Sequence, residues 1–415
     1  MSLLADLLST LIDRRLPTLG GAKADGRPIE TLCRDLIGSK GEVSGYAIAT
    51  QILDLYGQMD DAEKHAFFTF LNEEMDIDTE EVTEATAAYA AEGTTASYRR
   101  LMLAAEPDRQ ELARRLNQVP GATGRIVALR KDLLRFIKTD PSLAKVDSDL
   151  RHLLSSWFNR GFLVLRPINW ESPAHILEKI IAYEAVHAID SWDDLRRRLQ
   201  PSDRRCFGFF HPAMPDEPLI FVEVALTKGI PSSIQSVLTE GRDVLAEDKA
   251  DTAVFYSISN CQAGLAGISF GNSLIKQVAG DLSASLPQLS TFVTLSPIPG
   301  LMRWIEETGL GDLVDDPDAL RGLAAHYLLE AKRPGGLPRD PVARFHLKNG
   351  ASVHDVHARA DLSPNGLKQS GGAMVNYLYD LNRITENHEA FAATQKVAAS
   401  SAMRSLSRKA MPTNA

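Results

Sequence analysis

Residues 253–282 read AVFYSISNCQAGLAGISFGNSLIKQVAGDL, and this stretch decides the fold of the second half of the chain. Residues 253–259 are largely apolar, as in a central strand, and residues 272–286 have the apolar spacing of an amphipathic helix. Glycines between them allow a ligand to approach the backbone, and the start of a helix offers free N–H groups. The unit therefore predicts a phosphate or pyrophosphate site, although it matches neither GxGxxG nor GxxxxGK[ST].

The segments around this unit predict a mixed sheet with helices on both faces. Strands are expected at 162–170, in a hairpin over 206–228, and at 253–259, 291–295, 342–350 and 351–361. Helices are expected at 174–187, 191–199, 272–286 and 317–332. Ser172-Pro173 is a typical helix start, with a capping residue followed by proline at the first helical position.

The first part of the chain reads as a series of helices. Apolar residues recur at three- and four-residue spacing in residues 46–56, 61–75, 79–91 and 125–137, and an amphipathic helix is expected at the N-terminus. A chain of 415 residues exceeds the usual size of a single hydrophobic core. We therefore expect two domains, an all-α bundle over residues 1–158 and an α/β domain over residues 159–415.

Charge and cysteine content exclude several classes of protein. The net charge is −9, and residues 1–160 hold 20 Lys and Arg against 25 Asp and Glu, so the helical part has no basic excess for nucleic acid. The N-terminus lacks the pattern of a signal peptide and is too short to span a membrane. Cys33, Cys206 and Cys261 are far apart and form no CxxC pair, which favours a reduced, cytoplasmic setting.

Two further stretches carry candidate catalytic side chains. In TLSPIPG, residues 294–300, Ser296 follows a strand and is flanked by two prolines that stiffen the chain. His346 is the central polar residue of RFHL, which we assign to a strand, and spacing alone does not bring it to Ser296. His354 and His357 would lie on opposite faces of a strand, so a metal site is not favoured there. His211, at a hairpin turn, is interpreted as structural.

Together these segments resemble a known family. The order of elements is similar to the acetyltransferase (GNAT) fold, in which the loop after the central strand holds the pyrophosphate of coenzyme A. The segments AVFYSISNCQAGLAGISFGNSLIKQVAGDL, TFVTLSPIPGLMRWI, VARFHLKNGA, GAMVNYLYDL and WFNRGFLVLRPINWESP resemble malonyl-CoA decarboxylases. The resemblance covers nearly the whole chain. This chain differs from the family at Ser269, where some members carry an acidic residue. The stretch between LSPIPG and FHLKNG is also short for the family.

The resemblance implies a cofactor-independent decarboxylation of malonyl-CoA to acetyl-CoA and CO2, in a homotetramer assembled through the helical domain. It implies that Ser296 orients the substrate, that His346 protonates the enolate, and that the loop Ala266, Gly267, Ile268, Ser269, Phe270, Gly271 and Asn272 contacts CoA. Two alternatives remain open at this stage. One is an acyl-CoA N-acetyltransferase on the same fold, and the other is a non-catalytic protein that binds CoA esters.

Overall fold

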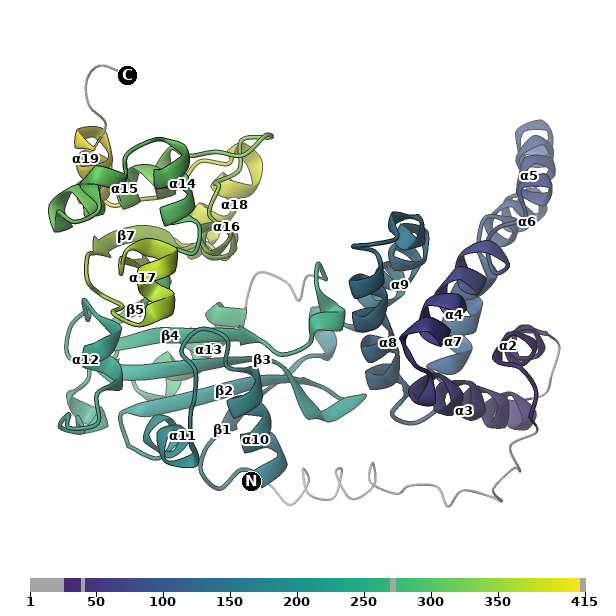
Figure 1. Cartoon of the computed structure of the whole chain (residues 1–415), viewed down its shortest axis with the longest axis horizontal. Coiled ribbons are helices and arrows are strands. Elements are labelled where there is room, and N and C mark those ends of the chain that lie inside the picture. The colour runs from purple at the N-terminus through teal and green to yellow at the C-terminus, as the bar shows by residue number, and fades with distance from the viewer. Residues whose placement is uncertain (1–25, 39–41, 269–273, 411–415) are drawn as a thin grey trace. The chain divides into compact units, whose positions relative to one another are not determined.

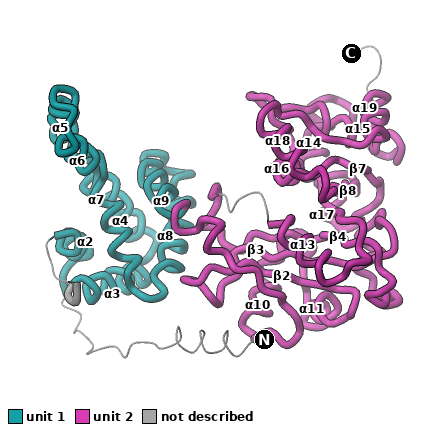
Figure 2. Tube along the Cα trace, turned by 180° about the vertical axis from the view of Figure 1, so that it is seen from behind, with its two compact units in different colours: residues 1–154 teal, residues 155–415 magenta. Residues whose placement is uncertain are grey.

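The computed structural model describes residues 26–38, 42–268 and 274–410, and the chain forms two compact units, residues 1–154 and 155–415 (Figure 2). Unit 1 is entirely helical in its described residues (Figure 1). Its helices are α2 (Ile29–Ile37), α3 (Glu42–Gln58), α4 (Asp61–Glu73), α5 (Thr79–Glu92), α6 (Thr95–Ala104), α7 (Asp108–Leu116), α8 (Ala122–Phe136) and α9 (Ala144–Trp157). The predicted helical bundle is confirmed, whereas the expected helix at the N-terminus lies outside the described residues.

Capping residues explain where the helices of unit 1 begin. Asp60 accepts a hydrogen bond from the N–H of Glu63, whose side chain bonds back to the Asp60 N–H, which is a capping box at the start of α4. Asp78 accepts from the N–H groups of Glu80 and Glu81 at the start of α5. Acidic side chains at these positions therefore serve the starts of helices.

Unit 2 is built on a mixed sheet with the strand order β1-β2-β3-β4-β5-β8-β6, and β7 pairs with β8. The strands are β1 (Val164–Ile168), β2 (Arg204–His211), β3 (Met214–Thr227), β4 (Thr252–Asn260), β5 (Thr291–Thr294), β6 (Ser296–Pro297), β7 (Ser352–His357) and β8 (Met374–Leu378). Among the named strands of the described residues, only β4 and β5 pair in parallel, from Thr252 opposite Thr291 to Phe255 opposite Thr294. The expected mixed sheet flanked by helices is confirmed.

Helices cover both faces of this sheet (Figure 1). One apolar cluster joins α10 (Ala174–Tyr183) and α11 (Trp192–Leu199) to β1, β2 and β3, while a second joins α12 (Ile234–Leu238) to β3, β4 and β5. α13 (Leu274–Ser285) connects the parallel pair β4 and β5. The remaining helices are α14 (Leu301–Glu307), α15 (Pro317–Leu329), α16 (Pro341–Lys348), α17 (Pro364–Ser370), α18 (Ile384–Thr394) and α19 (Ser401–Lys409).

One sequence prediction is wrong in a way that matters for the site. Residues 342–350 were expected to form a strand, but Pro341–Lys348 is the helix α16. Asp340 caps it by accepting a hydrogen bond from the N–H of Ala343 at 2.7 Å, and Pro341 occupies the first turn. Ala343, His346 and Leu347 are buried at three- and four-residue spacing, so His346 projects from a helix.

Candidate active site

Ser296 lies just beyond the point where the parallel pairing of β4 and β5 ends. The N–H of Leu295 donates to the carbonyl of Phe255 at 3.0 Å, and the next residue, Ser296, pairs with Val375 of β8. The chain thus leaves β4 for β8 at Ser296, whose side chain is largely buried. Its hydroxyl donates to Oγ1 of Thr294 at 2.9 Å. Pro297 supplies no N–H donor, so the two-residue strand β6 ends there.

His346 reaches Ser296 from α16. The Nε2 atom of His346 lies 3.2 Å from Ser296 Oγ, and its Nδ1 atom lies 2.7 Å from the hydroxyl of Tyr379. The imidazole stacks on the ring of Tyr377 at 4.4 Å between centroids and is 2% exposed. The structure therefore brings together the two residues that were predicted as separate candidates, although they are 50 positions apart.

Burial sets the protonation states of this group. It lowers the pKa of His346 to about 3, so the imidazole is neutral at neutral pH. Burial also raises the pKa of the Tyr379 phenol well above its ordinary value, so the phenol keeps its proton. We therefore assign Tyr379 as the donor to His346 Nδ1, His346 Nε2–H as the donor to Ser296, and Ser296 as the donor to Thr294.

The end of this chain of hydrogen bonds is anchored to the sheet. Thr294 Oγ1 also accepts from the N–H of Tyr377 at 3.1 Å, and its carbonyl accepts from the amide of Asn376 at 2.8 Å. Asn376 and Tyr377 belong to β8 and are fully buried. The Ser296 hydroxyl and the His346 imidazole are thus held by buried partners on β5, on β8 and just after β8. Such fixed positions suit catalysis.

Asp340 lies between the segment that carries Ser296 and the helix that carries His346. It is fully buried and caps α16, and the backbone N–H of Gly300, at the end of the SPIPG turn, lies near its carboxylate, although Oδ2 has no hydrogen-bond partner within the described residues. Burial raises the pKa of Asp340 to about 6, against the opposing effect of the backbone N–H groups of Ala343, Val342 and Gly300. A buried carboxylate between the Ser296 turn and the His346 helix is the kind of group that fixes their separation.

The predicted CoA loop is described only in part. Ala266, Gly267 and Ile268 follow a short turn at Ala263–Leu265, whereas Ser269, Phe270, Gly271 and Asn272 lie outside the described residues. Gly267 has φ of 75°, a backbone conformation that favours glycine, and the N–H of Ile268 donates to the carbonyl of Leu265 at 3.0 Å. The described part therefore forms a tight glycine turn between β4 and α13.

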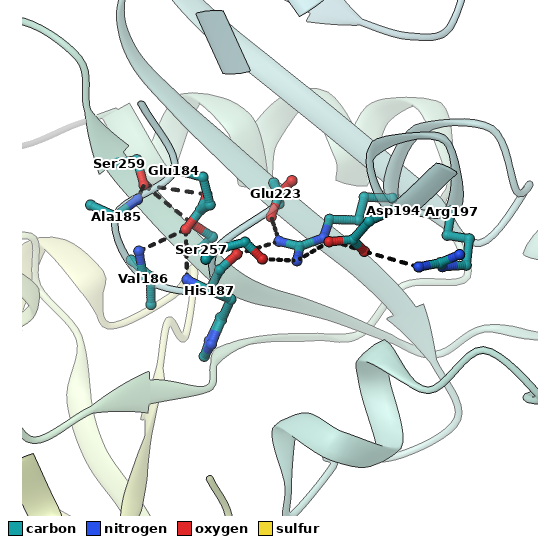
Figure 3. Close-up of polar contacts among 11 residues, drawn as sticks. Glu184, Ala185, Val186, His187, Asp194, Arg197, Glu223, Ser257 and Ser259 are labelled. Atoms are coloured by element: carbon teal, nitrogen blue, oxygen red, sulfur yellow. Dashed lines mark hydrogen bonds and ion pairs between the residues drawn. The ribbon is translucent and has the colours of Figure 1, made fainter. Parts of the chain in front are cut away.

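A polar network at the end of β4 was missed by the sequence analysis (Figure 3). The carboxylate of Glu184 accepts from the hydroxyl of Ser257 at 2.7 Å and 2.9 Å, and from the N–H groups of Val186 and His187. Phe255 and Thr294 are the last paired residues of β4 and β5. Ser257 lies two residues after Phe255, and Ser296, in β6, lies two residues after Thr294. The two serines therefore occupy equivalent positions on strands that part after their last paired residues.

Arg198 holds the segment after α10 against the sheet in the same region. Its guanidinium donates to the carbonyls of His187 and Ala188 at 2.8 Å and 2.9 Å, and lies 3.3 Å from Glu223. Burial, followed by the nearby Glu184, raises the pKa of Glu223 to about 8. Glu184 and Arg198 thus bind the N–H and carbonyl sides of one backbone segment.

Two of the other singled-out histidines, His211 and His357, have structural partners, whereas His354 lines a separate pocket between β7 and α19. His211 Nε2 lies 3.0 Å from the carbonyl of Trp157, and its Nδ1 accepts from the N–H of Ala213. His357 contacts the side chain of Asn376. In the described part of the chain, no group of three His, Cys, Asp or Glu residues is arranged to hold a metal ion. None of the described helices is long and apolar enough to cross a lipid bilayer.

Comparisons with known proteins agree across the chain. A family model described as "Malonyl-CoA decarboxylase N-terminal domain" matches residues 76–158, and the "Malonyl-CoA decarboxylase C-terminal domain" matches residues 161–317 and 314–415. The mitochondrial malonyl-CoA decarboxylase of Mus musculus is 32% identical over 91% of this chain and 86% of its own length. That of Anser anser anser is 36% identical over 71% of this chain and 68% of its own.

Solved structures show the same similarity. The crystal structure of malonyl-CoA decarboxylase from Rhodopseudomonas palustris has a TM-score of 0.87 and 48% sequence identity, covering 91% of this chain and 98% of that one. The structure from Agrobacterium vitis has a TM-score of 0.86 and 50% identity, covering 91% and 99%.

Proposed function

The chain belongs to the malonyl-CoA decarboxylase family, and on that premise we propose that Ser296, His346 and Tyr379 decarboxylate malonyl-CoA to acetyl-CoA and CO2. The observation that carries the assignment of these residues is the buried chain of hydrogen bonds from Tyr379 through His346 to Ser296. No metal or organic cofactor is needed in this proposal, because the thioester carbonyl of the substrate accepts the electron pair that CO2 leaves behind.

Ser296 serves to orient the substrate. The bond to the departing carboxylate must lie parallel to the π orbitals of the thioester carbonyl, so that the electron pair of that bond becomes the enolate. A hydroxyl at a strand end, held by Thr294, is suited to bind the malonyl group in this orientation. When the substrate binds, the Ser296 O–H turns from Thr294 Oγ1 to the thioester oxygen, where a positioned donor stabilises the negative charge that develops.

His346 supplies the proton to the enolate carbon. A histidine can do so either as a charged imidazolium or as a neutral imidazole connected to a proton source, and its low pKa supports the second form. Nε2–H is then transferred to carbon, while the hydroxyl of Tyr379 passes its proton to Nδ1. After product release, a proton from solvent restores Nε2–H, and the proton on Nδ1 returns to the phenolate of Tyr379, so that the starting hydrogen bonds are regenerated.

The loop 266–272 is proposed to hold the phosphates of CoA. Its support is the position of the loop between β4 and α13, together with the glycine conformation at Gly267. We also propose that residues 1–158 form a helical oligomerisation and support domain, and that residues 159–415 form the catalytic domain.

The decisive assay uses malonyl-CoA labelled with ¹⁴C in its free carboxyl group. Release of labelled CO2 without an amine acceptor distinguishes the decarboxylase from an N-acetyltransferase and from a non-catalytic CoA-binding protein. Ser296→Ala should bind CoA nearly as tightly as the wild type and lose about a hundredfold in kcat, as expected for a donor to developing charge. A kcat near that of the wild type would remove Ser296 from the mechanism.

A stereochemical assay isolates His346. Decarboxylation of chirally labelled malonyl-CoA in heavy water should deliver deuterium to one face of the enolate. His346→Asn removes the proton donor, so that water protonates the carbon and facial selectivity is lost. Unchanged rate and unchanged stereochemistry in this variant would assign protonation to another residue.

Assembly as a homotetramer in the cytoplasm is also a proposal. Tyr98, Met102 and Leu103 of α6 are between 48% and 73% exposed, and Tyr98 packs on the exposed Tyr89 of α5, which gives the helical unit an apolar surface suited to another subunit. The three cysteines are buried free thiols, which fits a reducing compartment, although the mouse and goose relatives are named mitochondrial. Light scattering and cell fractionation test the two proposals.

A further inference from the structure

A polar pocket outside the candidate active site lies between β7, β8, α18 and α19. It has a volume of about 300 Å³, which is large enough for a small organic molecule. Leu378 forms part of its wall, whereas Tyr377 and Tyr379 contact His346, and successive side chains along a strand point to opposite faces. The pocket therefore opens on the face of β8 that is turned away from His346.

Positive charge predominates among the side chains that line the pocket. Arg383, Lys396 and Arg404 come from three separate segments, and the acidic groups that share the wall are Asp380 and Glu386. Arg383 lies 3.7 Å from Glu386, whereas Lys396 and Arg404 have no ion pair with any carboxylate of the described residues. Two cations from different segments thus line the same hollow, and neither forms an ion pair within the described part of the chain, although Asp380 and Glu386 share the wall.

The start of α19 adds to this positive character. Ser400 lines the pocket and caps the helix by accepting a hydrogen bond from the N–H of Met403 at 3.1 Å. The N–H groups of the first helical turn have no partner within their own helix, and the helix dipole places its positive end there. Anions bind favourably in such surroundings, and the side chains of Lys396 and Arg404 supply full charges beside it.

The remaining wall is apolar and indicates what else the ligand carries. Ala390, Ala398, Ala399 and Leu378 line the pocket, so a ligand with a short carbon body gains contacts that an inorganic ion does not. We propose that this pocket binds a small organic phosphate, with the phosphate group between Lys396 and Arg404 and the carbon body on the alanines. Arginine and lysine are the side chains that most often bind phosphate groups.

The pocket is connected to the helix that carries His346. Asn387, which lines the pocket from α18, donates its side-chain amide to the carbonyl of Gly350 at 3.2 Å, and the neighbouring His388 contacts the carbonyl of Lys348. Lys348 is the last residue of α16, and Gly350 lies two residues beyond it. A bound phosphate ester would therefore act on the end of α16, which gives the pocket a route to modulate the rate of the enzyme.

Calorimetric titration with phenyl phosphate tests the proposal without relying on activity. The full-length protein is first saturated with CoA, so that the proposed CoA loop is occupied, and ionic strength is held constant. We expect binding to the wild type and at least about tenfold weaker binding to Lys396→Gln and to Arg404→Gln, which corresponds to one lost charge-assisted hydrogen bond of about 1.4 kcal/mol. Circular dichroism checks that both variants fold.

Arg408→Gln is the matched control, because Arg408 is exposed on the same helix, α19, and does not line the pocket. It should bind phenyl phosphate as the wild type does. The proposal is overturned if phenyl phosphate does not bind at millimolar concentrations, if the control weakens binding as much as the two pocket variants, or if benzoate binds equally well. The last result would assign the pocket to carboxylates.

Discussion

Replacing Asp340 by Asn tests whether a buried carboxylate fixes the Ser296 segment relative to the His346 helix. The pKa of Asp340 is raised from 3.8 to about 6, mainly by burial. At about 1.4 kcal/mol per pH unit, the ionised form costs the folded state about 3 kcal/mol. Between about pH 4 and about pH 6 the folded protein binds more protons than the unfolded chain, so the free energy of unfolding falls as pH rises through this window.

Asn cannot ionise, so the free energy of unfolding of the Asp340→Asn protein does not fall in this way as pH rises. Relative to the wild type, its free energy of unfolding should rise by about 3 kcal/mol from about pH 4 to about pH 7. The amide oxygen can still cap α16, but the amide N–H₂ group faces the N–H groups that the carboxylate faced, including that of Gly300. We therefore expect kcat to fall by about ten- to a hundredfold, because misplacement by about 1 Å has effects of this size. KM for malonyl-CoA should change little.

Urea melts followed by tryptophan fluorescence measure the stability of the relevant unit alone, because Trp157, Trp170, Trp192 and Trp304 all lie in residues 155–415. Asp316→Asn is the matched control. Asp316 is also followed by proline and also caps a helix, α15, but it is exposed. The reasoning is refuted if the stability of Asp340→Asn relative to wild type is independent of pH and its kcat stays within about twofold of the wild type.

Three further predictions concern the site itself. Tyr379→Phe removes the donor to His346 Nδ1 and should lower kcat by about tenfold with little change in the KM for malonyl-CoA; an unchanged kcat would exclude the proton relay. Because His346 has a pKa of about 3, kcat should not fall between about pH 7 and about pH 9, and a decline there in a stopped-flow pH profile would instead indicate an imidazolium acid. Gly267→Val should raise the KM for malonyl-CoA more than it lowers kcat, since a branched side chain is strained at φ of 75° and obstructs the backbone; an unchanged KM in a folded variant would place the phosphate site elsewhere.

The sequence predicted the parts of the fold that depend on local pattern. The strand, glycine turn and helix around Gly267 have strong periodicities and were located correctly in their described residues. The prediction for residues 342–350 was wrong because the short run VARFHL also fits a strand, and the Asp340-Pro341 start signal was not used there. The Ser172-Pro173 signal was used, but Ser172 does not cap α10: Pro173 precedes the first helical residue and the Ser172 hydroxyl accepts from the N–H of Asn169.

The residues that complete the site could not be found by spacing. Ser296 and His346 were recognised through motifs, but their contact depends on how α16 packs against β8. Tyr379 belongs to a segment, GAMVNYLYDL, that was noticed only for its resemblance, and nothing in its local pattern marks the phenol as a partner of the imidazole. Asp340 and Glu184 act through burial and tertiary hydrogen bonds, which a single sequence does not reveal.

The 3.2 Å contact between Ser296 Oγ and His346 Nε2 also brings together the two ends of a long chain segment, and this has an evolutionary consequence. The loop contains helices α14 and α15, and both of its ends are fixed by the contact and by Asp340. The entropy of closing a flexible loop grows only with the logarithm of its length, about 0.6 kcal/mol for each doubling. Natural variants can therefore gain or lose surface segments between α14 and α16 at little thermodynamic expense, as long as Gly300 and Asp340 keep their positions. Length variation among relatives should concentrate in this interval, while the spacing from Asp340 to His346, fixed by helical geometry, stays constant.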